Sequence, residues 1–83
     1  MGKKYFIIGR STCPFCVMAE DLMIASKIEY VFMDYNRRQS MLDDYKEFYN
    51  HPTVPIILSN DIETGLTKFV GGYTQLLEHL GGN

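Results

Sequence analysis

Residues 4–26 read KYFIIGRSTCPFCVMAEDLMIAS, and this stretch decides the fold. The apolar run at 4–9 is short and ends in glycine, which predicts a buried strand. Apolar positions at helical spacing follow. They predict a helix over 14–26 that starts with a proline, whose missing N–H is harmless in the first turn. Cys13 and Cys16 therefore stand where a strand passes directly into a helix.

The rest of the chain alternates between segments with the hydrophobic spacing of a strand and segments with the hydrophobic spacing of a helix. Strands are predicted at 29–34, 55–59 and 66–70, and helices at 37–49 and 74–80. Ser11 or Thr12 is the expected cap of the first helix, and Thr74 is the expected cap of the last. The middle helix is expected to turn an apolar stripe toward the core, made of Met41, Tyr45, Phe48 and Tyr49.

This element order, β-α-β-α-β-β-α, predicts an α/β fold. The first β-α-β unit gives parallel strands, and the turn-rich segment 60–65 joins the last two strands as an antiparallel hairpin. The result is a four-stranded mixed sheet with helices on both faces. It resembles a minimal thioredoxin-like fold.

Length and composition restrict the class of protein. With 83 residues, 46% of them hydrophobic and 22% charged, we expect one globular domain over 1–83. A net charge of -2 gives no basic excess for nucleic acid. No apolar run approaches the roughly 18 residues of a membrane span, and the run at 5–8 is too short for a signal peptide. We therefore expect a cytoplasmic monomer that binds neither nucleic acid nor membrane.

The two cysteines, Cys13 and Cys16, carry the chemistry of this chain. At the start of a helix, free backbone N–H groups and the helix dipole stabilise a thiolate at Cys13, and Arg10 adds a nearby positive charge. Cys16 lies one turn further into the helix and is expected to be more buried. We therefore predict that Cys13 is the nucleophile and that Cys16 is the resolving thiol.

Other uses of a C-x-x-C pair fit less well. A structural zinc site needs four ligands, and only His51 and His79 remain, both expected on the surface and at no recognised spacing. Val17 stands where a c-type haem site would have His. Spacing alone leaves open two unreactive core cysteines, but a strand before and a helix after the pair favour redox chemistry.

Two further segments are candidates for binding. Pro55 directly precedes a strand in the run TVP at 53–55, so its peptide bond could be cis and the Val54 backbone free to pair with an extended peptide. An ordinary loop proline explains the segment equally well. In the run GGYT at 71–74, glycines allow close approach of a ligand, and the N–H groups of Thr74 and Gln75 offer an anion site. A turn with a helix cap is an equal alternative.

Together these motifs resemble the glutaredoxins, specifically the small bacterial dithiol type. The likeness rests on FIIGRS at 6–11, CPFCV at 13–17, TVP at 53–55 and GGYT at 71–74. Thioredoxins usually carry W-C-G-P-C, and this chain has no Trp. The resemblance implies a thioredoxin fold and a thiol–disulfide exchange enzyme that uses glutathione as its reducing co-substrate, with no metal.

The resemblance also implies a role for each motif residue. Cys13 would be the nucleophile and Cys16 the resolving thiol. Val54 would pair with the cysteinyl backbone of glutathione, Thr74 would receive the γ-glutamyl carboxylate, and Arg10 would lie near the glycyl carboxylate or the thiolate. The predicted glutathione-binding residues are Arg10, Phe15, Thr53, Val54, Pro55 (in the cis form), Gly72, Tyr73, Thr74 and Gln75.

Two residues depart from the family pattern. Phe15 replaces the more usual Tyr, and Gln75 stands where the family often has an Asp that pairs with the γ-glutamyl ammonium. An amide loses the charge assistance of a carboxylate, so glutathione would bind more weakly unless Glu78, one turn on, compensates.

The resemblance leaves three functions to compare. The first is the reduction of protein disulfides and glutathione mixed disulfides, with ribonucleotide reductase as a candidate client. The second is electron donation by a protein that thioredoxin reductase recharges, which Gln75 keeps open. The third is a glutathione-ligated iron–sulfur carrier, against which Pro14 and the second thiol argue.

Overall fold

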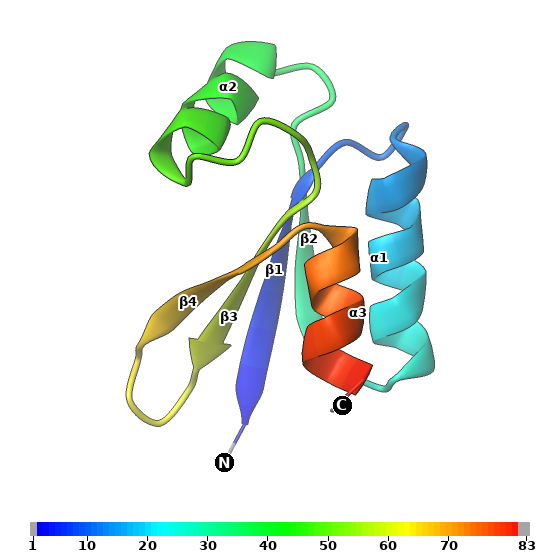
Figure 1. The fold of residues 1–83 in the computed structure, drawn as a ribbon, viewed down its shortest axis with the longest axis vertical. Coiled ribbons are helices and arrows are strands. Elements are labelled where there is room, and N and C mark those ends of the chain that lie inside the picture. The colour runs from blue at the N-terminus through cyan, green and yellow to red at the C-terminus, as the bar shows by residue number, and fades with distance from the viewer. Residues whose placement is uncertain (1, 82–83) are drawn as a thin grey trace.

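The computed structural model describes residues 2–81. The chain folds into an α/β structure in which helices pack on a β-sheet (Figure 1). Strands and helices follow one another in the predicted order. The strands are β1 (Lys3–Gly9), β2 (Tyr30–Asp34), β3 (Ile56–Asp61) and β4 (Thr67–Gly71), and the helices are α1 (Pro14–Ala25), α2 (Gln39–Phe48) and α3 (Tyr73–Gly81). No helix within 2–81 has the length and apolar character that a membrane crossing requires.

The four strands form one mixed sheet in the order β2-β1-β3-β4. Strand β1 pairs in parallel with β2 and antiparallel with β3, and β3 and β4 form the predicted hairpin. The pairing of β3 with β4 shifts register between Ile57 and Leu58. The α/β, thioredoxin-like architecture expected from the sequence is confirmed.

Helices cover both faces of the sheet, and each face has its own apolar cluster. Helices α1 and α3 lie side by side on one face, and α2 lies on the other (Figure 1). Alternating side chains of β1 point to the two faces of the sheet, as the two-residue period of a strand requires. The α1/α3 side buries Tyr5, Ile7, Ala19, Met23, Ile57 and Leu76, and the α2 side buries Ile8, Leu42, Ile56 and Leu58.

The first helix is not capped by Ser11 or Thr12, so that prediction is wrong. Cys13 itself is the residue before the helix, in an extended conformation, and its side chain makes no capping hydrogen bond. The backbone N–H of Ser11 donates to Asp34 Oδ1 (3.1 Å), and the Thr12 hydroxyl donates to Asn36 Oδ1 (2.9 Å). The end of β2 thus holds the loop that precedes the cysteines.

The cap of α3 also differs from the prediction. Thr74 is the second residue of the helix, and Gly72 precedes the first. The backbone N–H of Gly72 donates to Gln75 Oε1 (2.9 Å), which is the side-chain half of a capping box. The oxygen of Gln75 is therefore already engaged in this structure.

The stripe predicted for the middle helix is only half right. Tyr45 and Tyr49 pack against the core, but Leu42 is the side chain that becomes fully buried. Met41 and Phe48 are 39% and 78% exposed. The reason is helical spacing, because Leu42, Tyr45 and Tyr49 lie at i, i+3 and i+7 on one face, whereas Met41 and Phe48 share the neighbouring stripe.

Candidate active site

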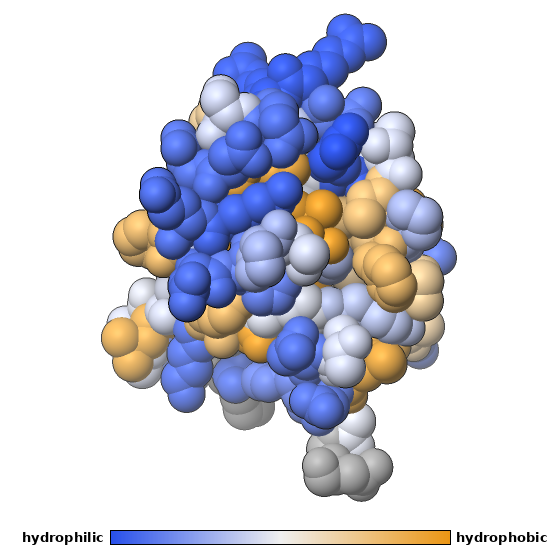
Figure 2. Space-filling model, turned by 45° about the horizontal axis from the view of Figure 1, so that its top comes forward, coloured by the Kyte–Doolittle hydropathy of each residue, from blue (hydrophilic) through white to orange (hydrophobic). Residues whose placement is uncertain are grey.

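The two thiols lie at the junction between β1 and α1. Cys13 is partly exposed and Cys16 is completely buried, and both are free thiols in this structure. The Cys13 N–H donates to the carbonyl of Arg10 (3.0 Å), and the Cys13 carbonyl accepts from the N–H of Val17 (3.1 Å). Figure 2 shows this end of the molecule, where hydrophobic residues gather over α1 and hydrophilic residues cover α2.

The environment of Cys13 favours its thiolate. Partial burial alone would raise the pKa of Cys13, but stabilising contacts outweigh it and the pKa is lowered. Interactions with the backbone N–H and the thiol of Cys16 lower the pKa of Cys13 most, followed by the interaction with the backbone N–H of Phe15. The positive charge of Arg10 acts in the same direction. These are the groups that a helix start is expected to supply to a reactive cysteine.

The environment of Cys16 has the opposite effect. Burial, together with the neighbouring Cys13 thiol, raises the pKa of Cys16 to about 12. The backbone N–H of Arg10, 3.5 Å from Cys16 Sγ, opposes this shift. The exposed thiol is thus the more acidic one, as predicted for a nucleophile with a buried resolving partner.

This asymmetry predicts selective alkylation. Iodoacetamide is expected to label Cys13 first, with a rate that levels off below the ordinary thiol pKa, because only the thiolate reacts. Peptide mapping by mass spectrometry across pH gives both the site and the midpoint. The control is Cys13→Ser, in which buried Cys16 should stay unlabelled near neutral pH; rapid labelling of Cys16 there would contradict the assignment.

Gly9 makes room for the buried sulfur. A Cβ atom added at Gly9 would overlap Cys16 Sγ, and it would stand in ordinary contact, 3.7 Å, with the Cα of Pro55, the residue before β3. Since the overlapping atom is a fully buried sulfur, glycine is the residue that fits at the end of β1 without a shift of its neighbours.

Beside the thiols lies a pocket of about 330 Å³, which is within the usual size range of small-molecule sites. All of the predicted glutathione-binding residues except Arg10 line it, although they come from three separate parts of the chain. The lining comprises Phe15, His51, Thr53, Val54, Pro55, Gly72, Tyr73, Thr74 and Gln75.

The starts of α1 and α3 meet at this pocket. The rings of Phe15, at the start of α1, and Tyr73, at the start of α3, lie 6.1 Å apart. The Val54–Pro55 peptide bond is cis, as the resemblance implied. Arg10 does not line the pocket, and it acts instead on the thiols through its charge and its backbone N–H.

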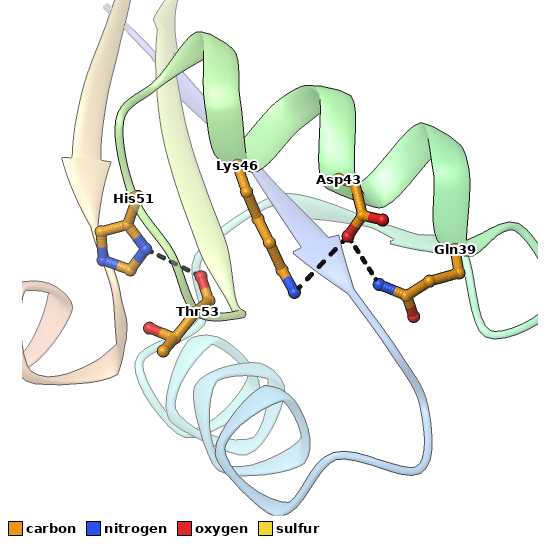
Figure 3. A network of polar contacts seen from close by, with 5 residues as sticks. All are labelled: Gln39, Asp43, Lys46, His51 and Thr53. Carbon is orange, nitrogen blue, oxygen red and sulfur yellow. Dashed lines mark hydrogen bonds and ion pairs between the residues drawn. The ribbon is translucent and has the colours of Figure 1, made fainter.

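His51 is the one lining residue that the sequence reasoning missed. It was expected on the loop surface, but it is partly buried and its Nδ1 lies 2.8 Å from the carbonyl oxygen of Thr53 (Figure 3). Its ring also packs edge-on against Phe69 of β4. The signal that could have revealed it is its position two residues before the TVP run.

Glu78 does not join this pocket. It lines a neighbouring depression between β4 and α3, together with Ser59, Lys68 and His79, and Gln75 lines both. His79 is exposed, as predicted, although its Nε2 lies 2.9 Å from the Tyr5 hydroxyl. Glu78 thus does not line the pocket itself, and its compensation for Gln75 stays a prediction.

The described part of the chain, 2–81, contains no cluster of three or more His, Cys, Asp or Glu side chains that could hold a metal ion. Its site combines two thiols, one with a lowered pKa (Cys13) and one with a raised pKa (Cys16), with a pocket beside them. A thioredoxin-like fold with such a pair defines a thiol–disulfide oxidoreductase.

The comparisons with known proteins identify the family. The glutaredoxin family model matches residues 4–62, so the chain belongs to the glutaredoxin family. No curated protein sequence matches it.

Solved structures of glutaredoxins share the fold. Wheat glutaredoxin is 20% identical with a TM-score of 0.78, over 95% of this chain and 72% of that one. Glutaredoxin 1 from Francisella tularensis, in complex with cacodylate, is 23% identical with a TM-score of 0.63, and the match covers 98% of this chain and 95% of that one. A dithiolic glutaredoxin of Trypanosoma brucei brucei is 27% identical with a TM-score of 0.68, and the match covers 95% of this chain and 80% of that one.

Proposed function

We propose that this glutaredoxin reduces protein disulfides and glutathione mixed disulfides, with glutathione as the reductant. One observation carries the proposal: residues from three distant segments line a single pocket that begins at Phe15, two residues from Cys13. A tripeptide thiol held in this pocket would have its sulfur near the acidic thiol.

The exchange follows from the two pKa values. The Cys13 thiolate attacks one sulfur of the client disulfide, forms a mixed disulfide and releases the other sulfur as a thiolate. Cys16, once deprotonated, attacks Cys13 Sγ, closes the Cys13–Cys16 disulfide and releases the second client thiolate. Two glutathione molecules then reduce this disulfide and leave as glutathione disulfide.

The lining residues supply the binding groups for glutathione in this proposal. The backbone of Val54 pairs with the cysteinyl residue, and Phe15 packs beside it. The N–H groups at the start of α3, with the Thr74 hydroxyl, receive a carboxylate. Arg10 stabilises the thiolate rather than the ligand, because it lies outside the pocket lining.

A second candidate is an electron donor that thioredoxin reductase recharges. The engaged oxygen of Gln75 favours it, because a γ-glutamyl ammonium finds no carboxylate among the lining residues. In this case the thiol chemistry is the same, and only the source of electrons differs.

Two coupled assays separate the candidates. With glutathione, glutathione reductase and a small disulfide, we expect steady consumption of NADPH; with thioredoxin reductase in their place, we expect none. Turnover in the second assay alone would overturn the glutathione proposal. Clients, among which we propose a cytoplasmic ribonucleotide reductase, are identified by trapping mixed disulfides on Cys16→Ser and mass spectrometry.

A further inference from the structure

His51 is a polar side chain in the pocket beside the cysteines. Among the residues that the structure describes, 2–81, the lining of this pocket includes no Asp, Glu, Lys or Arg. A neutral imidazole has one ring nitrogen that donates a hydrogen bond and one that accepts. His51 can therefore offer an acceptor to a ligand in a pocket whose lining has no carboxylate.

The orientation of the His51 ring is defined by its contacts. A carbonyl oxygen can only accept, so the 2.8 Å contact with the Thr53 carbonyl places the proton on Nδ1. In the neutral ring Nε2 is then an acceptor. A Cβ on Gly72 would stand 3.4 Å from Nε2 and 3.3 Å from Cε1, so this edge of the ring faces the start of α3.

The start of α3 otherwise presents mostly donors. Gln75 Oε1 already accepts from the Gly72 N–H, which leaves the Gln75 amide with its two N–H donors for a ligand. The first backbone N–H groups of the helix are donors as well. Such a surface suits a carboxylate, but the γ-glutamyl end of glutathione also carries an ammonium group, which needs an acceptor.

We propose that Nε2 of neutral His51 accepts a hydrogen bond from the γ-glutamyl ammonium group. This inference rests on the proposed use of glutathione, and it names the residue that recognises the amino end of that ligand.

The test is a comparison of two ligands that cannot exchange disulfides. S-methylglutathione and its analogue without the α-amino group are titrated into the reduced protein, with binding followed by calorimetry. At about pH 7.5 we expect the parent chain to prefer S-methylglutathione about tenfold, the effect of one hydrogen bond to a charged group.

Substitutions assign this preference to one residue. His51→Ala should bind both ligands equally. His51→Gln, whose side-chain oxygen can accept, should keep a preference for S-methylglutathione. His79→Gln is the matched control, since His79 lies outside the pocket, and it should behave as the parent chain does.

Three outcomes would overturn the inference. A parent chain that binds both ligands equally at about pH 7.5, or a His51→Ala variant that keeps the preference, would exclude His51 as the acceptor while leaving glutathione binding intact. Absence of binding by either ligand would overturn the proposed function as well.

Discussion

Cys13→Ser is expected to lose the reduction of glutathione mixed disulfides and of protein disulfides alike, down to the uncatalysed rate. The thiolate is the attacking species in both reactions, and a serine hydroxyl is not ionised near neutral pH. Contacts with Cys16, Phe15 and Arg10 that lower the pKa of Cys13 have no thiolate to stabilise in this variant. The two coupled assays, with a glutathionylated peptide and a protein disulfide, measure the loss.

Cys16→Ser separates the two reactions. It should keep the removal of glutathione from a peptide, which needs only Cys13, and it should lose the reduction of protein disulfides, which needs a resolving thiol. Cys16 is fully buried, so Cys16→Ala is the control for a hydroxyl placed in an apolar site. Full dithiol activity in either variant would show that the assigned roles are wrong.

Gly9→Ala is expected to destabilise the fold through the buried sulfur. The added methyl group overlaps Cys16 Sγ, and this sulfur is fully buried, so either the strand end or α1 must move. Overpacking of this kind ordinarily destabilises by about 1–3 kcal/mol. For a domain of this size, a loss at the lower end of that range lowers Tm by about 4–8 °C.

A double-variant cycle isolates this contact. Gly9→Ala with Cys16→Ala removes the sulfur that the methyl group meets, and should recover most of the Tm lost in Gly9→Ala relative to Cys16→Ala alone. The matched control is Gly81→Ala, where an added Cβ meets nothing within 4 Å and Tm should not fall. Equal Tm values for Gly9→Ala and the parent chain would contradict the overlap.

The order of helices and strands could be predicted because the spacing of hydrophobic residues and the positions of the Gly, Pro and turn residues indicate the same elements along this chain. The caps could not be predicted from Ser and Thr alone. The Ser11 backbone and the Thr12 hydroxyl are taken by Asp34 and Asn36, which lie far away in sequence, and Gln75 caps α3 with its side chain. Capping propensity is local, whereas these hydrogen bonds depend on the packed loops.

The lining of the pocket could be predicted where a family motif lies at the start of a helix or strand. The motif residues Phe15, Val54 and Thr74 line one pocket, although their roles toward glutathione stay predictions. His51 could not be placed in this way. Its ring is held by the carbonyl of Thr53 and by Phe69 on β4, and neither contact follows from a local pattern.

The pKa of Cys16 depends on the state of Cys13, and this dependence has a consequence for the order of the proposed steps. Burial raises the pKa of Cys16, and so do the hydrogen bond and the charge of Cys13. Once Cys13 Sγ is in a mixed disulfide it carries no charge and no proton, so both contributions from Cys13 end and burial alone opposes the N–H and charge of Arg10. In the proposed reaction, the pKa of Cys16 is therefore expected to be highest in the resting dithiol and to fall once Cys13 is held in a mixed disulfide.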